Sequence, residues 1–343
     1  MSRPRPGWRR RRARRRAAGL VVGLVALAAA AWFVVGPPAQ DGGEPPAMSA
    51  TGSRVPQKPV PPLPRPEQQE AVGPLPEPAG ANHVDLAQPS VLSSLRLRPG
   101  PKAGLAFDLA DGRVLWRLHA TTVRPIASLT KLMTALLAVE RFGPRQKVRI
   151  TRAADRVGGS RMGGLKPGRR VRADVLLKGL LISSANNAAV ALAIAGAGSE
   201  RAWVALMNTR ARLLGLTCTH YVDPHGLDVR NRSCAADLAT LTMRAMSEPR
   251  IVAIARKRFA RVWPGAGRKL TLRTTNHLLR DHYPGAIGLK TGYTNPAGFC
   301  LAAVVQRGKR RIGIVVLGSR DSFGDARRLA REAARVGALP GAA

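Results

Sequence analysis

An uninterrupted run of 20 uncharged residues occupies positions 17–36 and decides where the rest of the chain can fold. In a helix that rises about 1.5 Å per residue, this run spans about 30 Å, the thickness of a bilayer's hydrocarbon core. Residues 1–16 contain nine arginines and no acidic residue, which favours a cytoplasmic location for that end. We therefore expect a basic cytoplasmic arm (1–16) and a transmembrane signal anchor (17–36).

This interpretation makes the chain a single-pass protein of the cell membrane, with its remainder on the extracytoplasmic side. The alternative is a cleaved signal peptide. Its apolar region is usually shorter than this one, and no small-x-small cleavage pattern directly follows Val35.

Residues 37–90 contain 14 of the 27 prolines and few aliphatic pairs. Such a segment cannot bury enough apolar surface to offset the entropy of ordering it. We expect a disordered, semi-rigid tether here. The folded domain is then confined to residues 91–343, which are long enough to bury a core of ordinary size.

The formal net charge of the chain is +36. The arm supplies +9 of it, and residues 37–90, with three basic and six acidic residues, supply −3, which leaves about +30 on the domain. An exported domain of this charge would meet anionic wall polymers or lipid headgroups, so we expect no nucleic acid partner. The alternative is an arginine-rich, solvated surface without a partner.

Periodicity indicates an α+β domain. Near its start, two strand-like runs flank an Asp-Gly turn, and near its end three more runs precede a helix; the five runs are 103–108, 113–118, 286–294, 298–306 and 311–318. Apolar helical stretches lie between them, and a helix follows at 325–336. Both ends of the domain should therefore contribute to one sheet. Residues 199–260 read as helix and loop with a strong turn at 222–226, and we assign them no chemistry.

The three cysteines are too few for a disulfide scaffold, and the sequence has neither a C-x-x-C motif nor a histidine cluster. No metal and no cofactor are implied. Cys218 and Cys234 lie close in sequence, and the sequence leaves open whether they form a disulfide. Cys300 lies in an apolar run, which favours a buried free thiol.

The first candidate site residues are Ser128 and Lys131, which form an S-x-x-K motif at the start of an apolar helix. They lie one turn apart and therefore on the same side of the helix. Lys131 is the only charged residue between Arg124 and Glu140, so its amine should be desolvated. Burial and a neighbouring positive charge lower the pKa of a lysine, and a neutral lysine can deprotonate a serine hydroxyl.

Two further polar clusters interrupt apolar runs. The stretch 176–196 contains Ser183, Ser184, Asn186 and Asn187, of which Ser184 and Asn186 form an S-x-N motif. Lys178 and these four polar residues argue against a membrane span, and the simplest structural interpretation is a capped junction between two core helices. The third motif, Lys290-Thr291-Gly292 (K-T-G), lies inside a strand-like run.

Three motifs in this order resemble the low-molecular-mass penicillin-binding proteins, the D-Ala-D-Ala carboxypeptidase family of serine peptidases. The resemblance runs from about residue 103 to about residue 338 and includes the strings RPIASLTKLMTA, SSANNAAVALA and GLKTGYTNPAGFCL. It implies a penicillin-recognising, β-lactamase-like transpeptidase fold. In that fold, helices flank an antiparallel sheet of about five strands, and an all-helical subdomain is inserted.

The resemblance also implies roles. Ser128 would form an acyl-enzyme with the penultimate D-alanine of peptidoglycan stem peptides, Lys131 would be its base, and Ser184 would carry a proton to the leaving amine. The substrate-binding residues would be Asn186, Lys290, Thr291, Gly292, Tyr293 and, after the last strand, Arg327. Backbone N–H groups of Ser128 and Tyr293 would bind the oxyanion, and β-lactams would be covalent inhibitors.

Three alternatives remain. The same machinery serves a D,D-endopeptidase that acts on cross-links. A β-lactamase would need a glutamate base between the second and third motifs, where Glu200 follows a helix cap and Glu248 lacks the E-x-x-L-N setting. A non-catalytic, basic wall-binding module is disfavoured by the intact motifs. Family members often carry a second domain and a C-terminal anchor, and fewer than 55 residues follow Lys290.

Overall fold

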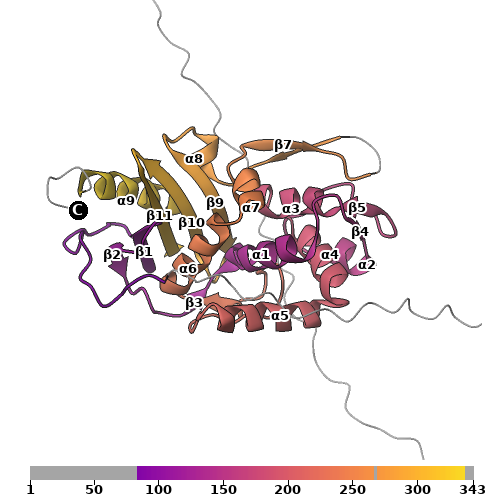
Figure 1. Cartoon of the computed structure of the whole chain (residues 1–343), viewed down its shortest axis with the longest axis horizontal. Coiled ribbons are helices and arrows are strands. Elements are labelled where there is room, and N and C mark those ends of the chain that lie inside the picture. Colours follow the sequence, from indigo (N-terminus) through magenta and orange to yellow (C-terminus); the bar gives the residue numbers. More distant parts are fainter. Residues whose placement is uncertain (1–82, 266–268, 337–343) are drawn as a thin grey trace, which may run out of the picture. The chain divides into compact units, whose positions relative to one another are not determined.

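The two ends of the domain meet in one antiparallel sheet of five strands, in the order β2-β1-β11-β10-β9 (Figure 1). Its strands are β1 (Ala103–Asp108), β2 (Val114–Leu118), β9 (Ala286–Thr294), β10 (Gly298–Arg307) and β11 (Arg310–Ser319). First and last strands pair directly, with Ala103 opposite Leu317. The α+β class and the shared sheet are confirmed.

The computed structural model describes residues 83–265 and 269–336. The predicted arm, the predicted anchor and most of the predicted tether lie outside these residues. Residues 83–90 of the expected tether lie against the domain: Asp85 bridges to Arg113, and the Arg117 guanidinium donates to the Leu86 carbonyl.

Both faces of the sheet are covered, which explains why its central strands read as continuous apolar runs. Helix α9 (Ser322–Val336) packs on the face that holds Ile314 and Val316, and α6 (Ala235–Met246) packs on the opposite face. Val315 and Leu317 belong to the larger core on that opposite face, as the two-residue period of a strand requires. Helix α9 begins three residues before the predicted start.

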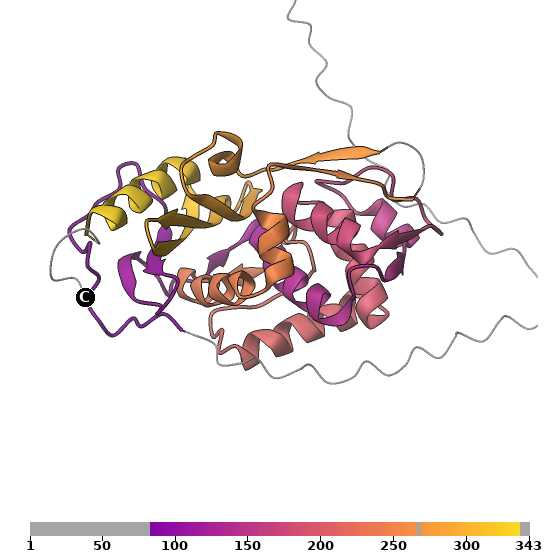
Figure 2. The same cartoon turned by 45° about the horizontal axis from the view of Figure 1, so that its top comes forward.

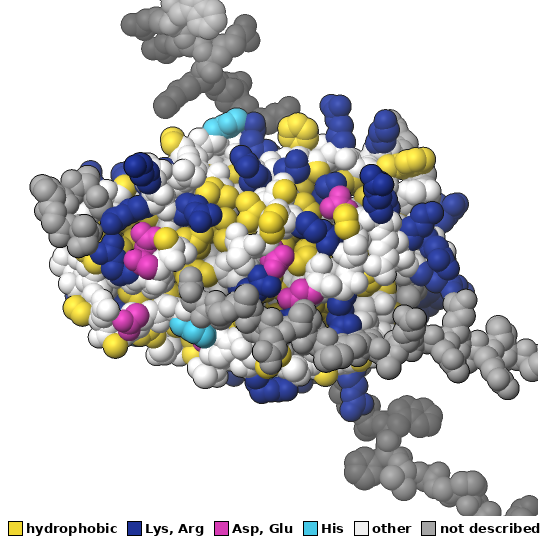
Figure 3. Space-filling model, viewed as in Figure 1, with side chains coloured by type: hydrophobic (Ala, Val, Ile, Leu, Met, Phe, Trp, Pro, Cys, Tyr) yellow, Lys and Arg dark blue, Asp and Glu magenta, His cyan; other side chains and the backbone are white. Residues whose placement is uncertain are grey.

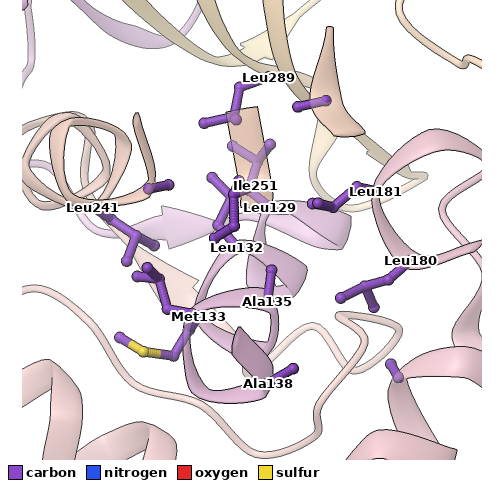
Figure 4. Packing of buried hydrophobic residues seen from close by; sticks show 14 of the residues in the cluster. Leu129, Leu132, Met133, Ala135, Ala138, Leu180, Leu181, Leu241, Ile251 and Leu289 are labelled. Carbon is purple, nitrogen blue, oxygen red and sulfur yellow. The ribbon is translucent and has the colours of Figure 1, made fainter. Parts of the chain in front are cut away.

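A mainly helical insertion fills the chain between β2 and β9 (Figure 2). Its helices are the 3-10 turn η1 (Ala127–Thr130), α1 (Lys131–Arg141), α2 (Arg152–Arg156), α3 (Ala173–Ile182), α4 (Asn186–Ala197), α5 (Glu200–Leu213), α6, α7 (Pro249–Ala255) and α8 (His277–Arg280). Figure 4 shows Leu129, Leu132 and Met133 at the centre of its core. Leu132 and Met133 lie on the buried face of α1, and Leu129 lies just before it in η1. The apolar spacing that predicted a helix after Ser128 is the spacing of these buried side chains.

The insertion also contains two-stranded ribbons that were not predicted: β3 (Arg124–Pro125) with β6 (Arg232–Ser233), β4 (Lys147–Arg149) with β5 (Arg170–Arg172), and β7 (Phe259–Val262) with β8 (Leu270–Arg273). Strands of two to four residues are too short to show a clear alternation in sequence. The expectation of an all-helical insertion needs this addition.

Cys218 and Cys234 form a disulfide, which settles the question that the sequence left open. Cys300 is a buried free thiol, as predicted. Across the described ranges, no single helix combines the length and apolar character needed to cross a bilayer; only α4 and α5 taken together, bent by 86°, meet that test.

Candidate active site

The nucleophile candidate, Ser128, lies in η1, and its hydroxyl is in contact with Lys131 at the start of α1. Lys131 Nζ is 2.9 Å from Ser128 Oγ. The two residues are one turn apart, as their spacing predicted. An amine at this distance can exchange a proton directly with the hydroxyl.

Lys131 is fully buried. Burial is the main reason that its pKa lies well below the usual 10.5, and the positive charge of Lys290 lowers that pKa further, whereas the carboxylate of Asp223 raises it. The two conditions that sequence reasoning required for a neutral lysine, desolvation and a second positive group, are both present.

A turn at residues 223–228, to which we assigned no chemistry, holds the amine of Lys131 from the other side. The His225 carbonyl accepts from Lys131 Nζ at 2.5 Å, and the Pro224 carbonyl accepts from Thr134 Oγ1 at 2.7 Å. The turn is thus fixed to two successive polar positions of α1. Gly226 has φ +85°, and a Cβ there would lie 2.0 Å from the Ala127 carbonyl oxygen.

Asp223 shapes this turn. Its Oδ1 accepts from the backbone N–H groups of His225 (2.7 Å) and Gly226 (2.5 Å), and its Oδ2 accepts from that of Asp228 at 2.9 Å. The imidazole of His225 is mostly buried, which lowers its pKa to about 4. The sequence signal was the Asp-Pro-His-Gly turn itself, which gives no indication of which helix its carbonyls face.

Ser184 and Lys290 form the second pair of the site. Lys290 Nζ donates to Ser184 Oγ at 3.0 Å and to the Thr291 carbonyl at 2.7 Å. Burial lowers the pKa of Lys290 to about 7. Ser184 adopts the left-handed conformation at φ 58°, which is strained for a residue with a side chain. Its neighbour Ser183 donates to the Gly179 carbonyl at the end of α3 and stays outside the site, as expected.

Asn186 begins α4 and holds a neighbouring loop. Its Nδ2 donates to the Gly158 carbonyl, and its backbone N–H donates to the Ser160 carbonyl, both at 2.7 Å. Asn187 bonds Met162 through both ends of its amide. These two side chains therefore fix the loop that contributes Ser160 to the wall of the site, a residue that sequence reasoning missed.

Gly292 lies against the backbone of the nucleophile. A Cβ at this position would be 3.1 Å from both the Ser128 nitrogen and the Ile126 carbonyl oxygen. The atoms nearest to such a side chain therefore belong to η1 and to its N-cap residue. Gly292 and Tyr293 lie on β9, an edge strand with one side unpaired within the sheet.

These groups border one pocket of about 490 Å³. The predicted residues that line it are Ser128, Ser184, Thr291, Gly292 and Tyr293; Lys131 and Lys290 lie beneath, in contact with its serines. The hydroxyl of Thr275, a residue that was not predicted, lies 2.6 Å from the hydroxyl of Thr291. Three motifs spread over residues 128–292 are thus brought to one cavity.

The structure does not bring Arg327 to the pocket. Its guanidinium lies on α9 and pairs with Asp281 at 2.8 Å. Arg320, which follows β11 directly, lines the pocket. The difference has a simple cause: an arginine one residue past the strand end remains beside the sheet, whereas one that is two turns further along the chain is carried away by the helix.

No glutamate lines the pocket among the residues that the structure describes. Glu200 follows the N-cap Ser199 of α5, as expected, and Glu248 pairs with Arg244 at 2.6 Å. The carboxylate that does line the pocket, Asp321, accepts from the Gly324 N–H through Oδ1. Neither glutamate is placed as a β-lactamase base.

One group of potential metal ligands was found within the described ranges, formed by Cys218, Cys234 and Asp237. Both sulfur atoms are engaged in the disulfide, and Asp237 Oδ2 accepts from the Cys218 N–H and the Thr219 hydroxyl. This arrangement is explained by the disulfide and its capping carboxylate.

Comparison with known proteins agrees with this geometry. A family profile for D-alanyl-D-alanine carboxypeptidases, peptidase family S11, matches residues 100–321. A D-alanyl-D-alanine endopeptidase of Pseudomonas aeruginosa is 35% identical over 279 residues, 74% of this chain and 88% of that protein. The carboxypeptidase DacF of Bacillus subtilis is 34% identical, and the match covers 64% of this chain but only 57% of DacF.

Solved structures are also similar. A D-alanyl-D-alanine carboxypeptidase from Mycobacterium tuberculosis superimposes with a TM-score of 0.67 and 31% identity, covering 74% of this chain and 98% of that one. Penicillin-binding protein 6B of Escherichia coli gives a TM-score of 0.64 at 34% identity, covering 74% and 82%.

Proposed function

Because the chain belongs to the D-alanyl-D-alanine carboxypeptidase family of serine peptidases, we propose that it releases the terminal D-alanine of peptidoglycan stem peptides through an acyl-enzyme on Ser128. The observation that carries this proposal is the 2.9 Å contact between Ser128 Oγ and the buried amine of Lys131.

In the acylation step, neutral Lys131 accepts the hydroxyl proton while Ser128 Oγ bonds to the carbonyl carbon of the penultimate D-alanine. Negative charge then develops on the carbonyl oxygen. The backbone N–H groups of Ser128 and Tyr293 are assigned to stabilise it, with Gly292 allowing β9 to lie against η1. One such donor typically contributes about 3 kcal/mol to lowering the barrier.

The leaving amine must gain a proton when the peptide bond breaks. Ser184 is assigned to deliver it, because its hydroxyl is already bonded to Lys290 Nζ at 3.0 Å. The leaving D-alanine also carries a carboxylate, for which the Thr291 and Thr275 hydroxyls and Arg320, all of which line the pocket, provide donors. Water then attacks the ester: its OH bonds to the acyl carbon, and its proton replaces the one that Ser184 gave up. Protonated Lys131 returns its proton to Ser128 Oγ as that oxygen leaves.

A fluorescent penicillin tests this chemistry, because only a working nucleophile becomes covalently labelled. Ser128→Ala should abolish the label and the release of D-alanine from a purified pentapeptide substrate. Ser184→Ala should slow both, and Ser183→Ala, a change in the adjacent α3 cap, is the matched control. Labelling of Ser128→Ala equal to that of the unaltered protein would refute the assignment.

A second candidate function is D,D-endopeptidase activity on cross-links. The pocket is also lined by Phe299 and Phe323, which give it an apolar part. Relatives from Pseudomonas aeruginosa and Escherichia coli are named endopeptidases. Digestion of purified cross-linked and uncross-linked muropeptides, with identification of the products, distinguishes the two activities.

Slow hydrolysis of the penicilloyl ester is expected, since no glutamate base lines the described pocket. Penicillin should therefore inhibit the enzyme rather than serve as its substrate. Turnover of many penicillin molecules per second would favour a β-lactamase.

We further propose that residues 17–36 anchor the protein in the cell membrane with the peptidase on the extracytoplasmic side. The support is the uncharged run behind nine arginines. Sedimentation of the full chain with membranes, and its release when residues 1–36 are deleted, would test the anchor. A protein found in the culture medium and beginning after residue 36 would indicate cleavage instead.

A further inference from the structure

The end of the domain that carries β4 and β5 has an unusual charge pattern. Residues 145–172 contain ten basic residues and one acidic residue, and all ten basic side chains are exposed. They are Arg145, Lys147, Arg149, Arg152, Arg156, Arg161, Lys166, Arg169, Arg170 and Arg172. We call this set the basic end. Figure 3 shows dark blue side chains gathered where Figure 1 labels α2, β4 and β5.

Four of these charges are placed directly against one another. In the β4–β5 ribbon, Lys147 lies opposite Arg172 and Arg149 lies opposite Arg170. Val148 and Val171, between them, point into the core at 1% and 2% exposure. The four charges therefore project from the same, outward face. Like charges directly opposite on neighbouring strands are destabilising.

This repulsion is not relieved within the part of the chain that the structure describes. Of the ten side chains, only that of Arg161 makes an ion pair, with Asp155 at 2.7 Å. A fold that holds nine unpaired cations together, four of them in opposed pairs, has a surface suited to a ligand with several negative charges.

The chemistry of the surface identifies the kind of ligand. Eight of the ten side chains are arginines, whose planar guanidinium binds phosphate oxygens in pairs. Residues 145–172 expose no large hydrophobic side chain that could insert into a bilayer. One exposed aromatic residue, Trp263, adjoins them, next to Pro264, which lies against Gly164; a single ring can stack on one base but not on a run of bases. A soluble chain of repeated phosphates fits these features.

We propose that the basic end binds a flexible polyol-phosphate chain, an anionic polymer whose phosphodiester backbone carries no bases. This inference goes beyond the proposed function and does not depend on it. The basic end lies next to the active site without belonging to it: Arg161 follows Ser160, which lines the pocket, and no residue of the basic end does so.

The test compares two full-length variants with the same change of charge. In the ribbon variant, Lys147, Arg149, Arg170 and Arg172 are each replaced by glutamine. In the control variant, the exposed residues Arg98, Lys102, Arg311 and Arg331 are replaced by glutamine. The control residues lie beside β1, β11 and α9, at the other end of the domain (Figures 1 and 2). Both variants keep residues 1–16, so any contribution from that arm cancels.

Binding of a fluorescent poly(glycerol phosphate) chain is measured by anisotropy at several salt concentrations. We expect the ribbon variant to bind at least about tenfold more weakly than the unaltered protein at low salt. Its binding should also depend less on salt, because fewer phosphate contacts release fewer counterions. The control variant should lose no more than about threefold. The melting temperature of the ribbon variant should rise or stay unchanged, because opposed like charges have been removed.

Equal losses in both variants would overturn the proposal, because total charge alone would then explain binding. So would a ribbon-dependent loss confined to anionic vesicles or to duplex DNA. Penicillin labelling of the same samples separates this question from catalysis: the ribbon variant should label at the unaltered rate, and an unaltered protein that fails to label would refute the proposed function alone.

Discussion

The active site and the basic end use the same kind of side chain in opposite ways. At the active site, Lys131 and Lys290 are 0% and 1% exposed, and burial lowers the pKa of both amines. At the basic end, Lys147, Arg149, Arg170 and Arg172 are exposed and carry their charges face to face. Burial turns a cation into a base that can take part in chemistry, whereas exposure keeps it as a charge that can only attract.

The two regions also differ in the groups that surround their basic side chains. The buried amines are surrounded by acceptors, namely serine hydroxyls and the carbonyls of His225 and Thr291. The exposed cations have water. A substitution that returns a fixed charge to the buried region should therefore have a much larger effect than the removal of charge from the exposed one.

Lys131→Arg should have the largest effect. A guanidinium stays protonated in proteins and cannot accept the Ser128 proton. The rate of acylation by a β-lactam should fall by about 10³-fold, as expected for loss of a general base. Stopped-flow or gel-based labelling measures the rate. Lys178→Arg is the control, since Lys178 is partly exposed and paired with Asp174. An unchanged rate in Lys131→Arg would show that Ser128 does not need a neutral amine at position 131.

Gly292→Ala should follow, with a loss of about 10²-fold in acylation. The added methyl group would meet the Ser128 nitrogen and the Ile126 carbonyl at 3.1 Å and push β9 from η1, so the two oxyanion donors would separate. Gly143→Ala is the matched control, because no atom lies within 4 Å of a Cβ there. Comparable rates for the two variants, with normal melting temperatures, would speak against the assigned oxyanion site.

Removal of the disulfide with Cys218→Ala and Cys234→Ala should lower the free energy of unfolding by about 3 kcal/mol, as expected for a crosslink with a sequence separation of 16. Urea unfolding measures this loss. Because the closed loop carries the turn at 223–228, acylation should slow as well. Reduction of the unaltered protein should reproduce both effects, and reduction of the double variant should cause no further change. A further loss of stability or acylation rate on reducing the double variant would show that the reductant acts at a site other than this disulfide.

Asp223→Asn should have the smallest and most specific effect. The carboxylate raises the pKa of Lys131, so its removal lowers that pKa and leaves the amine neutral at more acidic pH. The acid limb of the acylation rate should therefore move to lower pH. Asp228→Asn removes a charge from the same turn. Because the Asp228 carboxylate is not among the charges that act on Lys131, this variant should leave the acid limb in place. Movement of the limb to higher pH would contradict this role.

Most of the fold and the first members of the site could be predicted from sequence because they rest on local patterns. The runs at 286–294 and 298–306 are β9 and most of β10. The middle of β10 is buried and therefore reads as a continuous apolar run. Ser128 and Lys131 are one turn apart, so a helix is enough to bring them together. The three motifs of the family supplied Ser184 and Lys290.

What could not be predicted depends on contacts between distant segments. The His225 carbonyl meets Lys131 across 94 residues, and a backbone carbonyl leaves no trace in the side-chain sequence. Arg320 and Arg327 are separated by a few residues, and only the start of α9 at Ser322 decides which one faces the pocket. The opposed charges of the basic end likewise became visible only with the register of β4 and β5.

A carbon-13 NMR titration of the lysine Cε signals tests the central claim most directly. We predict that the signals of Lys131 and Lys290, assigned by their absence in arginine variants, titrate well below the ordinary lysine value of about 10.4, with Lys290 near 7. If both signals instead titrate near that ordinary value, the amine beside Ser128 is charged at neutral pH and cannot be its base.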